Sequence, residues 1–249
     1  MGECVFVMGR TGSGKSYSLR NFEPGTVGVF SVGGKRMPFK GGPRSVSLRG
    51  MGYAARYRYI EETLKANNLN AYVVDDSSFL QADENLERAL EGGDQYRKFL
   101  EIGVHLARLV QVAADTDDDT IVYFLHHVDV DDIGRQKVRS IGKLVEEKYN
   151  PVERCNIVLT SVNRDGDYRF LTRNDGLNLS KCPPGMLPDE TGNDLAEVDR
   201  AAREFWGMAP LVQGAEKAAR KAAEAAAKTA AEAGPDGPAG ADNDEQKEI

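Results

Sequence analysis

Short apolar runs alternate with longer polar or amphipathic stretches over the first 206 residues. Continuous apolar runs predict strands that are buried on both faces, and apolar residues at helical spacing predict a packed helix at 96–114. The alternation of the two predicts an α/β domain whose mostly parallel sheet is flanked by helices. The strand predictions cover residues 4–8, 27–32, 70–74, 120–125 and 156–162.

The C-terminal part of the pattern differs. Residues 156–162 and 168–172 flank a turn sequence containing Asp165-Gly166, which predicts a β-hairpin. Residues 195–206 predict the last helix of a compact domain covering residues 1–208. An Ala-rich stretch at 209–233 favours a helical spacer without an apolar face, and 234–249 is acidic and predicted to be disordered. This tail is either solvated or a docking segment for a partner.

Composition restricts the partners. The net charge of −7 argues against coating nucleic acid through bulk charge, so a nucleic-acid site must be a local patch. No apolar run approaches membrane-spanning length, and the N-terminus enters the first strand without room for a signal peptide. Three separated cysteines match no metal or redox motif. We expect a cytoplasmic protein with no membrane partner.

A complete phosphate-binding loop follows the first strand directly. Its sequence fits G-x-x-x-x-G-K-S, and residues 16–21 can open a helix. In such a loop backbone N–H groups surround a phosphate, the lysine reaches the β- and γ-phosphates, and the serine completes the Mg²⁺ shell. The sequence therefore predicts binding of ATP with Mg²⁺ by Gly9, Arg10, Thr11, Gly12, Ser13, Gly14, Lys15, Ser16 and Tyr17.

Polar residues at the ends of two later strands complete the predicted site. Asp75 and Asp76 end the third apolar run, and His127 follows the fourth. Asp75 is the expected Mg²⁺ carboxylate beside Ser16, and Asp76 the expected general base. We expect Lys15 and His127 to act with Asp76 in catalysis, His127 by contacting the γ-phosphate or the attacking water.

Residues 24–60 contain no acidic residue, although they carry many cations and three tyrosines. Cations with interleaved aromatic rings suit a single nucleic-acid strand, because cations meet phosphates and rings stack on bases. The candidates are Lys35, Arg36, Lys40, Arg56, Tyr57 and Arg58. A second basic set, from which a finger could reach a neighbouring subunit, comprises Arg135, Lys137, Arg139, Lys143 and Lys148.

Several segments together resemble bacteriophage P-loop ATPases with a RecA-type core, the phage single-strand annealing and recombination family. They are residues 9–16, 34–40, 73–76, 122–127, 140–148 and 174–187. The resemblance implies a RecA-like ATPase in the host cytoplasm that binds single-stranded DNA beside a single-strand-binding protein, with a homo-oligomer left open. RecA-type ATPases usually place a catalytic Glu after the second strand, whereas residues 31–34 contain no acid. Either Asp76 replaces that base or hydrolysis is slow.

Two other functions stay open at this point. One is a P-loop kinase acting on a nucleotide or another small molecule, for which residues 135–139 offer a weak candidate lid. The other is a nucleotide-gated DNA-binding module that holds ATP without hydrolysing it. The absence of the usual Glu favours this second alternative.

Overall fold

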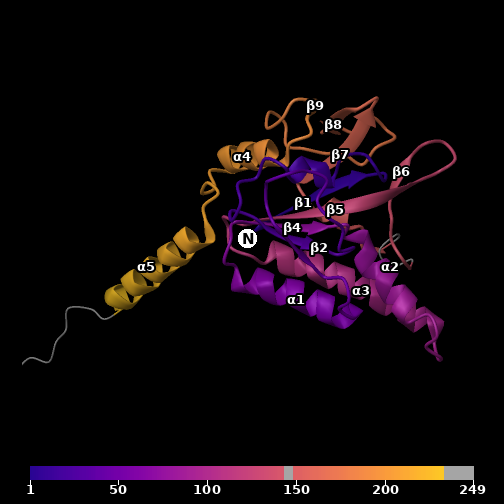
Figure 1. Cartoon of the computed structure of the whole chain (residues 1–249), viewed down its shortest axis with the longest axis horizontal. Helices are drawn as coiled ribbons and strands as arrows, with labels where there is room; N and C mark the ends of the chain where they lie inside the picture. The colour runs from indigo at the N-terminus through magenta and orange to yellow at the C-terminus, as the bar shows by residue number, and fades with distance from the viewer. Residues whose placement is uncertain (143–147, 233–249) are drawn as a thin grey trace, which may run out of the picture.

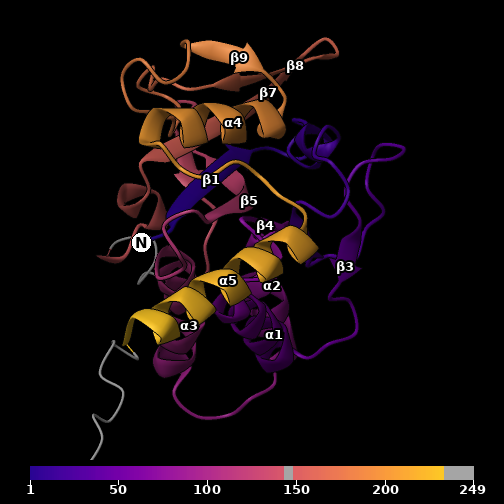
Figure 2. The same cartoon turned by 90° about the vertical axis from the view of Figure 1, so that its left-hand side faces the viewer.

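A single sheet runs through the middle of the molecule, with helices on both faces (Figures 1 and 2). The computed structural model describes residues 1–142 and 148–232 of the chain, and within them the sheet has nine strands. The strands are β1 (Glu3–Gly9), β2 (Gly28–Ser31), β3 (Ser45–Ser47), β4 (Ala71–Asp75), β5 (Ile121–Val130), β6 (Gln136–Val138), β7 (Ile157–Arg164), β8 (Asp167–Leu171) and β9 (Glu190–Gly192).

The strand order is β3-β2-β4-β5-β1-β7-β8-β9, with β6 paired to the far end of β5. Strands β3 to β7 are parallel along this path, and β8, β9 and β6 are antiparallel to their neighbours. One strand, β5, separates the phosphate-loop strand β1 from β4, which ends at Asp75. This is a RecA-like P-loop arrangement, so the expected fold class is confirmed.

Helices cover the two faces of the sheet unequally. Figures 1 and 2 show α1, α2 and α3 on one face and α4 on the other. None of the described helices is long and apolar enough to cross a membrane. The helical segments are the 3₁₀ turns η1 (Ser16–Leu19) and η3 (Pro151–Arg154) and the helices α1 (Tyr53–Ala66), α2 (Ser78–Glu87), α3 (Gln95–Ala114), α4 (Leu195–Trp206) and α5 (Gly214–Glu232).

The central strands are apolar on both sides because each face has its own core. In β1, Phe6 and Met8 pack into the core beneath α1 and α3, whereas Val5 and Val7 pack into the core beneath α4. Successive side chains of a strand point to opposite faces, so a strand covered on both faces must be apolar at every position. This is why the buried runs stand out in the sequence.

Three local predictions were wrong in detail. Residues 16–21 form only the short turn η1, because Leu19 and Phe22 turn into the core and Pro24 follows. The fourth strand does not end at His126 and His127 but continues to Val130, where it pairs with β6. The packed helix predicted at 96–114 is present as α3, but two apolar residues of its expected packed face, Phe99 and Val104, are exposed.

The predicted hairpin is present as β7 and β8. Asp165 and Gly166 both have positive φ, 53° and 93°, which is the backbone that a two-residue type I′ turn requires. The Asn163 side chain accepts a hydrogen bond from the Gly166 amide at 2.8 Å and closes the turn. An Asp-Gly pair flanked by two apolar runs was therefore a sufficient signal for this element.

Helix α5 projects from the body, yet its first turns are attached to it (Figure 1). Lys217 is buried and donates hydrogen bonds to the Asn67 side chain and the Leu69 carbonyl. Lys221 donates to the Ala66 and Asn67 carbonyls. The sequence indicated the helix but not this polar docking. Residue 233 and the predicted tail at 234–249 lie outside the described residues.

Candidate nucleotide-binding site

The residues predicted to bind phosphate and metal gather around one cavity of about 270 Å³ at the carboxyl ends of β1 and β4. Side chains following parallel strands meet at this edge of a sheet, which is where open α/β sheets bind ligands. The cavity is lined by Thr11, Gly12, Gly14, Lys15, Ser16, Tyr17, Lys35, Arg36, Pro38, Asp75, Asp76, His127 and Tyr168.

The phosphate loop is curled, and its lysine points into the curl. Gly12 and Gly14 have φ of +79° and +99°, a conformation that L side chains rarely adopt. A Cβ on Gly14 would also lie 2.5 Å from the Tyr168 ring. The Lys15 ammonium donates to the Gly9 and Arg10 carbonyls at 2.8 and 3.0 Å. Burial lowers the Lys15 pKa to about 8, although Asp76 and Asp75 favour its charged form.

The β7–β8 hairpin supports the loop from behind, which the sequence did not predict. Ser161 donates to the Ser13 carbonyl at 2.7 Å, and Asn163 donates to the Gly12 carbonyl at 3.5 Å. The Tyr168 ring packs against Gly14, and its centre lies 5.4 Å from the centre of the Tyr17 ring. These contacts depend on β7 lying beside β1, a pairing that the sequence pattern alone does not specify.

Ser16 and Asp75 meet as the metal prediction requires. The Ser16 hydroxyl donates to Asp75 Oδ1 at 2.8 Å. A hydroxyl and a carboxylate oxygen fit Mg²⁺, which takes oxygen ligands and completes its shell with water and phosphate. No cluster of three or more His, Cys, Asp or Glu side chains that could bind a metal occurs in residues 1–142 and 148–232. Burial and the adjacent Asp76 raise the Asp75 pKa to about 6, and a bound cation would favour its ionised form.

Asp76 has a left-handed backbone conformation, and its carboxylate lies between Lys35 and His127. Its φ is +58°, uncommon for a residue other than glycine. Lys35 Nζ donates to its Oδ2 at 3.0 Å, and His127 Nε2 lies 3.3 Å from its Oδ1. Burial raises the Asp76 pKa, but hydrogen bonds from His127 and Lys35 outweigh this and hold it at about 2. In this arrangement Asp76 is ionised but a weak proton acceptor.

His127 connects Asp76 to the phosphate-loop lysine. Its Nδ1 lies 3.5 Å from Lys15 Nζ, and its ring stacks on Phe79 at 5.8 Å. A charged lysine donates only, so Nδ1 must accept, and the proton of a neutral ring then lies on Nε2 and points to Asp76. The structure thus brings Lys15, Asp76 and His127 together, and their catalytic roles stay predictions.

Two of the residues proposed to contact nucleic acid, Arg56 and Tyr57, are buried in the fold. Arg56 donates to the Met51 carbonyl at 2.8 Å and pairs with Asp83 and Glu87. Tyr57 is 6% exposed and belongs to the core beneath α1 and α3. These two side chains cannot meet a nucleic-acid strand, because the amphipathic pattern of α1 turns them inward. Lys35 faces the cavity, and Arg36, Lys40 and Arg58 are exposed.

Residues 135–139, the candidate lid, belong to the β5–β6 hairpin. Arg135 pairs with Asp131 at 3.2 Å, and Arg139 pairs with Asp129 at 2.7 Å, all within the β5–β6 hairpin. Arg135 and Arg139 thus have anionic partners within the hairpin, which weakens the kinase alternative that relied on residues 135–139. Lys143 lies outside the described residues.

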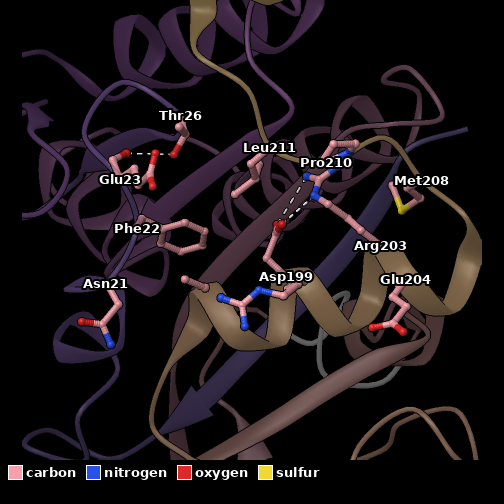
Figure 3. A pocket seen from close by; sticks show the side chains of 12 residues that line it. Asn21, Phe22, Glu23, Thr26, Asp199, Arg203, Glu204, Met208, Pro210 and Leu211 are labelled. Atoms are coloured by element: carbon pink, nitrogen blue, oxygen red, sulfur yellow. Dashed lines mark hydrogen bonds and ion pairs between the residues drawn. The ribbon is translucent and has the colours of Figure 1, made fainter.

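A larger cavity, of about 460 Å³, lies beneath α4 and away from the phosphate loop (Figure 3). Its buried charges are paired with each other: Arg203 donates to both carboxylate oxygens of Asp199. The remaining Arg203 donors bind the carbonyls of Asn70, Asp119 and Ala209. The lining therefore fastens α4 to the sheet, and it offers no phosphate loop.

Comparisons with known proteins add little to this geometry. No family model and no curated protein matches the chain. Among solved structures, a KaiC-like protein from the hyperthermophilic archaeon Pyrococcus horikoshii OT3 aligns with 68% of this chain and 76% of its own, at 14% identity and a TM-score of 0.34. Similarity at this level carries no functional argument, so the function must be argued from the site.

Proposed function

We propose that this protein binds ATP with Mg²⁺ and hydrolyses it to ADP and phosphate. The observation that carries the proposal is the Ser16–Asp75 hydrogen bond of 2.8 Å beside a curled loop whose Lys15 ammonium is buried. These are the parts that hold a triphosphate and its metal in P-loop NTPases.

The chain's residues have distinct tasks in this proposal. Lys15 binds the β- and γ-phosphates, while Ser16 and Asp75 would hold Mg²⁺, which neutralises phosphate charge when bound. A water oxygen bonds to the γ-phosphorus as the bond to the β,γ-bridging oxygen breaks, leaving its electron pair on ADP. The proton of the water passes to the Asp76 carboxylate, which His127 orients through its Nε2 proton. Release of the Lys35 hydrogen bond, one of the two that hold the Asp76 pKa low, makes this carboxylate a stronger proton acceptor for the step.

The direct test is Lys15→Ala. We expect ATP binding, measured by calorimetry with Mg²⁺, and phosphate release to be lost, because the loop then has no cation on the β- and γ-phosphates. Lys65→Ala, which removes an exposed lysine of α1, is the matched control and should behave as wild type. Unchanged affinity and turnover in the Lys15 variant would contradict the assignment. Binding without turnover in the wild-type protein would instead support the non-hydrolysing alternative.

We further propose that a single nucleic-acid strand binds along the β3 edge of the sheet. The supporting observation is a set of exposed cations in the loop before β3, after β3 and on α1, none of which has an ion-pair partner among the described residues. This set, the β3-edge cations, comprises Arg36, which also lines the nucleotide cavity, and Lys40, Arg44, Arg49 and Arg58. Tyr59 is 37% exposed on α1 and supplies an aromatic ring there in place of Tyr57. The DNA-annealing role and a single-strand-binding partner follow only from the resemblance.

A charge-matched comparison tests this surface. The triple variant Arg44→Ala, Arg49→Ala, Arg58→Ala should bind an oligonucleotide more weakly, and the salt dependence of log K should flatten by about 0.7 per lost phosphate contact. A triple variant of Arg97, Arg108 and Arg154 to Ala removes the same charge elsewhere and should not change the slope. Equal losses in both variants would indicate net charge alone and reject a specific surface.

A further inference from the structure

Lys35 lies on the wall of the nucleotide cavity, in the loop that connects β2 to β3. Gly33 and Gly34 bring it there: a Cβ on Gly33 would lie 3.4 Å from Asp76 Oδ2, and Gly34 has φ of +64°. Lys35 Nζ donates to Asp76 Oδ2 at 3.0 Å and lies 4.9 Å from the centre of the Phe79 ring. Residues 31–34, directly before Lys35, contain no acid, although RecA-type ATPases usually place a catalytic Glu after the second strand.

The Lys35–Asp76 contact is a pair that can be opened. The Lys35 side chain is 62% exposed, whereas that of Asp76 is 10% exposed. The exposed ammonium can leave Asp76 without displacing buried groups, and His127 remains beside the carboxylate when it does. A cation in this position is free to exchange one anionic partner for another.

The carboxylates on the cavity wall would repel an incoming phosphate, and a nearby cation offsets that repulsion. Asp75 and Asp76 are two carboxylates on the wall that a γ-phosphate must approach. Lys15 is at one end of the chain of contacts that runs through His127 and Asp76, and Lys35 is at the other, with successive distances of 3.5, 3.3 and 3.0 Å. The two lysines thus stand on either side of Asp76 in this chain of contacts.

We propose that Lys35 binds the γ-phosphate of ATP, exchanging the Asp76 carboxylate for the phosphate when the triphosphate enters. The proposal rests on the ATPase function proposed above and adds a residue to it. The exchange places a cation from the same chain on the terminal phosphate and leaves Asp76 Oδ2 open to water. ADP has no γ-phosphate, so Lys35 should contribute to ATP binding but not to ADP binding.

The test is Lys35→Ala, with ATP and ADP affinities measured separately by calorimetry in the presence of Mg²⁺. A lost charge-assisted hydrogen bond predicts an ATP affinity about 10- to 100-fold weaker. ADP affinity should stay within about twofold, which also reports that the variant is folded. The rate of phosphate release at saturating ATP should fall, because the cation on the transferred group is missing.

Two further variants sharpen the result. Lys35→Arg keeps the charge and should retain most of the preference for ATP, and Lys65→Ala should leave both affinities unchanged. Equal weakening of ATP and ADP, or no change in either, would overturn the role of Lys35 while the wild-type protein still binds and hydrolyses ATP. A wild-type protein that binds neither nucleotide would overturn the proposed function, and this inference with it.

Discussion

At the scale of single residues, the adjacent carboxylates Asp75 and Asp76 have different environments, and their substitutions should affect activity in different ways. Asp75→Asn should abolish Mg²⁺-dependent phosphate release, because the carboxylate that accepts from Ser16 is then lost. Asp76→Asn should keep ATP affinity and slow hydrolysis by about 10²- to 10⁴-fold, the usual effect of removing a general base. Calorimetry combined with phosphate release separates the two effects.

The outcome for Asp76 also decides where the base is. Normal turnover in Asp76→Asn would exclude it as the proton acceptor and direct attention to His127. Loss of ATP binding in that variant would indicate that Asp76 holds the site together rather than acting on water.

His126, beside the site but turned from it, should make stability depend on pH. Its ring is buried between the Ser77 hydroxyl and the Arg139 carbonyl, and burial lowers its pKa to about 4 from 6.5. Between these pH values His126 binds a proton in the unfolded chain but not in the folded chain. Its contribution to the free energy of unfolding is therefore fully present above pH 6.5 and is lost as the pH drops toward 4. From pH 6.5 to 5 the loss should be about 2 kcal/mol.

Urea unfolding of wild type and His126→Gln at several pH values measures this contribution. The variant should lack the part of the pH slope that His126 causes, although other groups still titrate in both proteins. Parallel pH profiles for the two proteins would show that His126 is not held neutral in the fold.

Some residues of the nucleotide cavity follow from local sequence patterns, and others depend on the tertiary fold. Gly9 to Ser16 and Asp75 were identifiable because a fixed spacing and a strand end each imply a position at one sheet edge. The support from Ser161 and Tyr168 was not, because it depends on the non-local pairing of β7 with β1. Lys35 was recognised as a cation, but its place at the nucleotide cavity was not, since nothing in the sequence indicates that a Gly-Gly turn carries it over Asp76.

At the scale of elements, α4 packs on the sheet through an apolar face and is also anchored by one buried arginine. Arg203 is 4% exposed, and its guanidinium connects Asp199 to carbonyls before β4, before β5 and after α4. Arg203→Met should destabilise the fold by about 3–5 kcal/mol, because it leaves the Asp199 carboxylate buried without its partner. Thermal or urea unfolding measures the loss.

Arg200→Ala removes an exposed arginine from the same helix and should change stability by less than about 0.5 kcal/mol. If the two variants are equally stable, Arg203 does not fasten α4. Elements themselves were well predicted where a local signal existed: residues 195–206 match α4, and Asp165-Gly166 marks the hairpin. The short η1 turn was missed because tertiary burial of Leu19 and Phe22 overrides local helix propensity.

At the scale of the whole molecule, the nucleotide cavity and the attachment of α5 lie at opposite ends of the strands. Lys15 and Asp75 follow the carboxyl ends of β1 and β4, whereas Lys217 contacts Asn67, Leu69 and Thr120, which precede β4 and β5. The alternating pattern predicted the layers of the fold, and it could not predict this attachment, because lysines on an Ala-rich helix look solvated in sequence. The two regions should therefore be separable by truncation.

Deleting residues 222–249 keeps both anchoring lysines and should leave the melting temperature unchanged. Deleting 211–249 removes Val212, Lys217 and Lys221 and should cost about 2 kcal/mol, mainly from lost hydrogen bonds, which corresponds to a fall of about 4–8 °C. Lys217→Met in the full chain should reproduce part of that fall. ATP affinity should be the same in all three proteins, since none of these changes reaches the cavity. Equal melting temperatures for both truncations would show that the α5 contacts contribute nothing to stability.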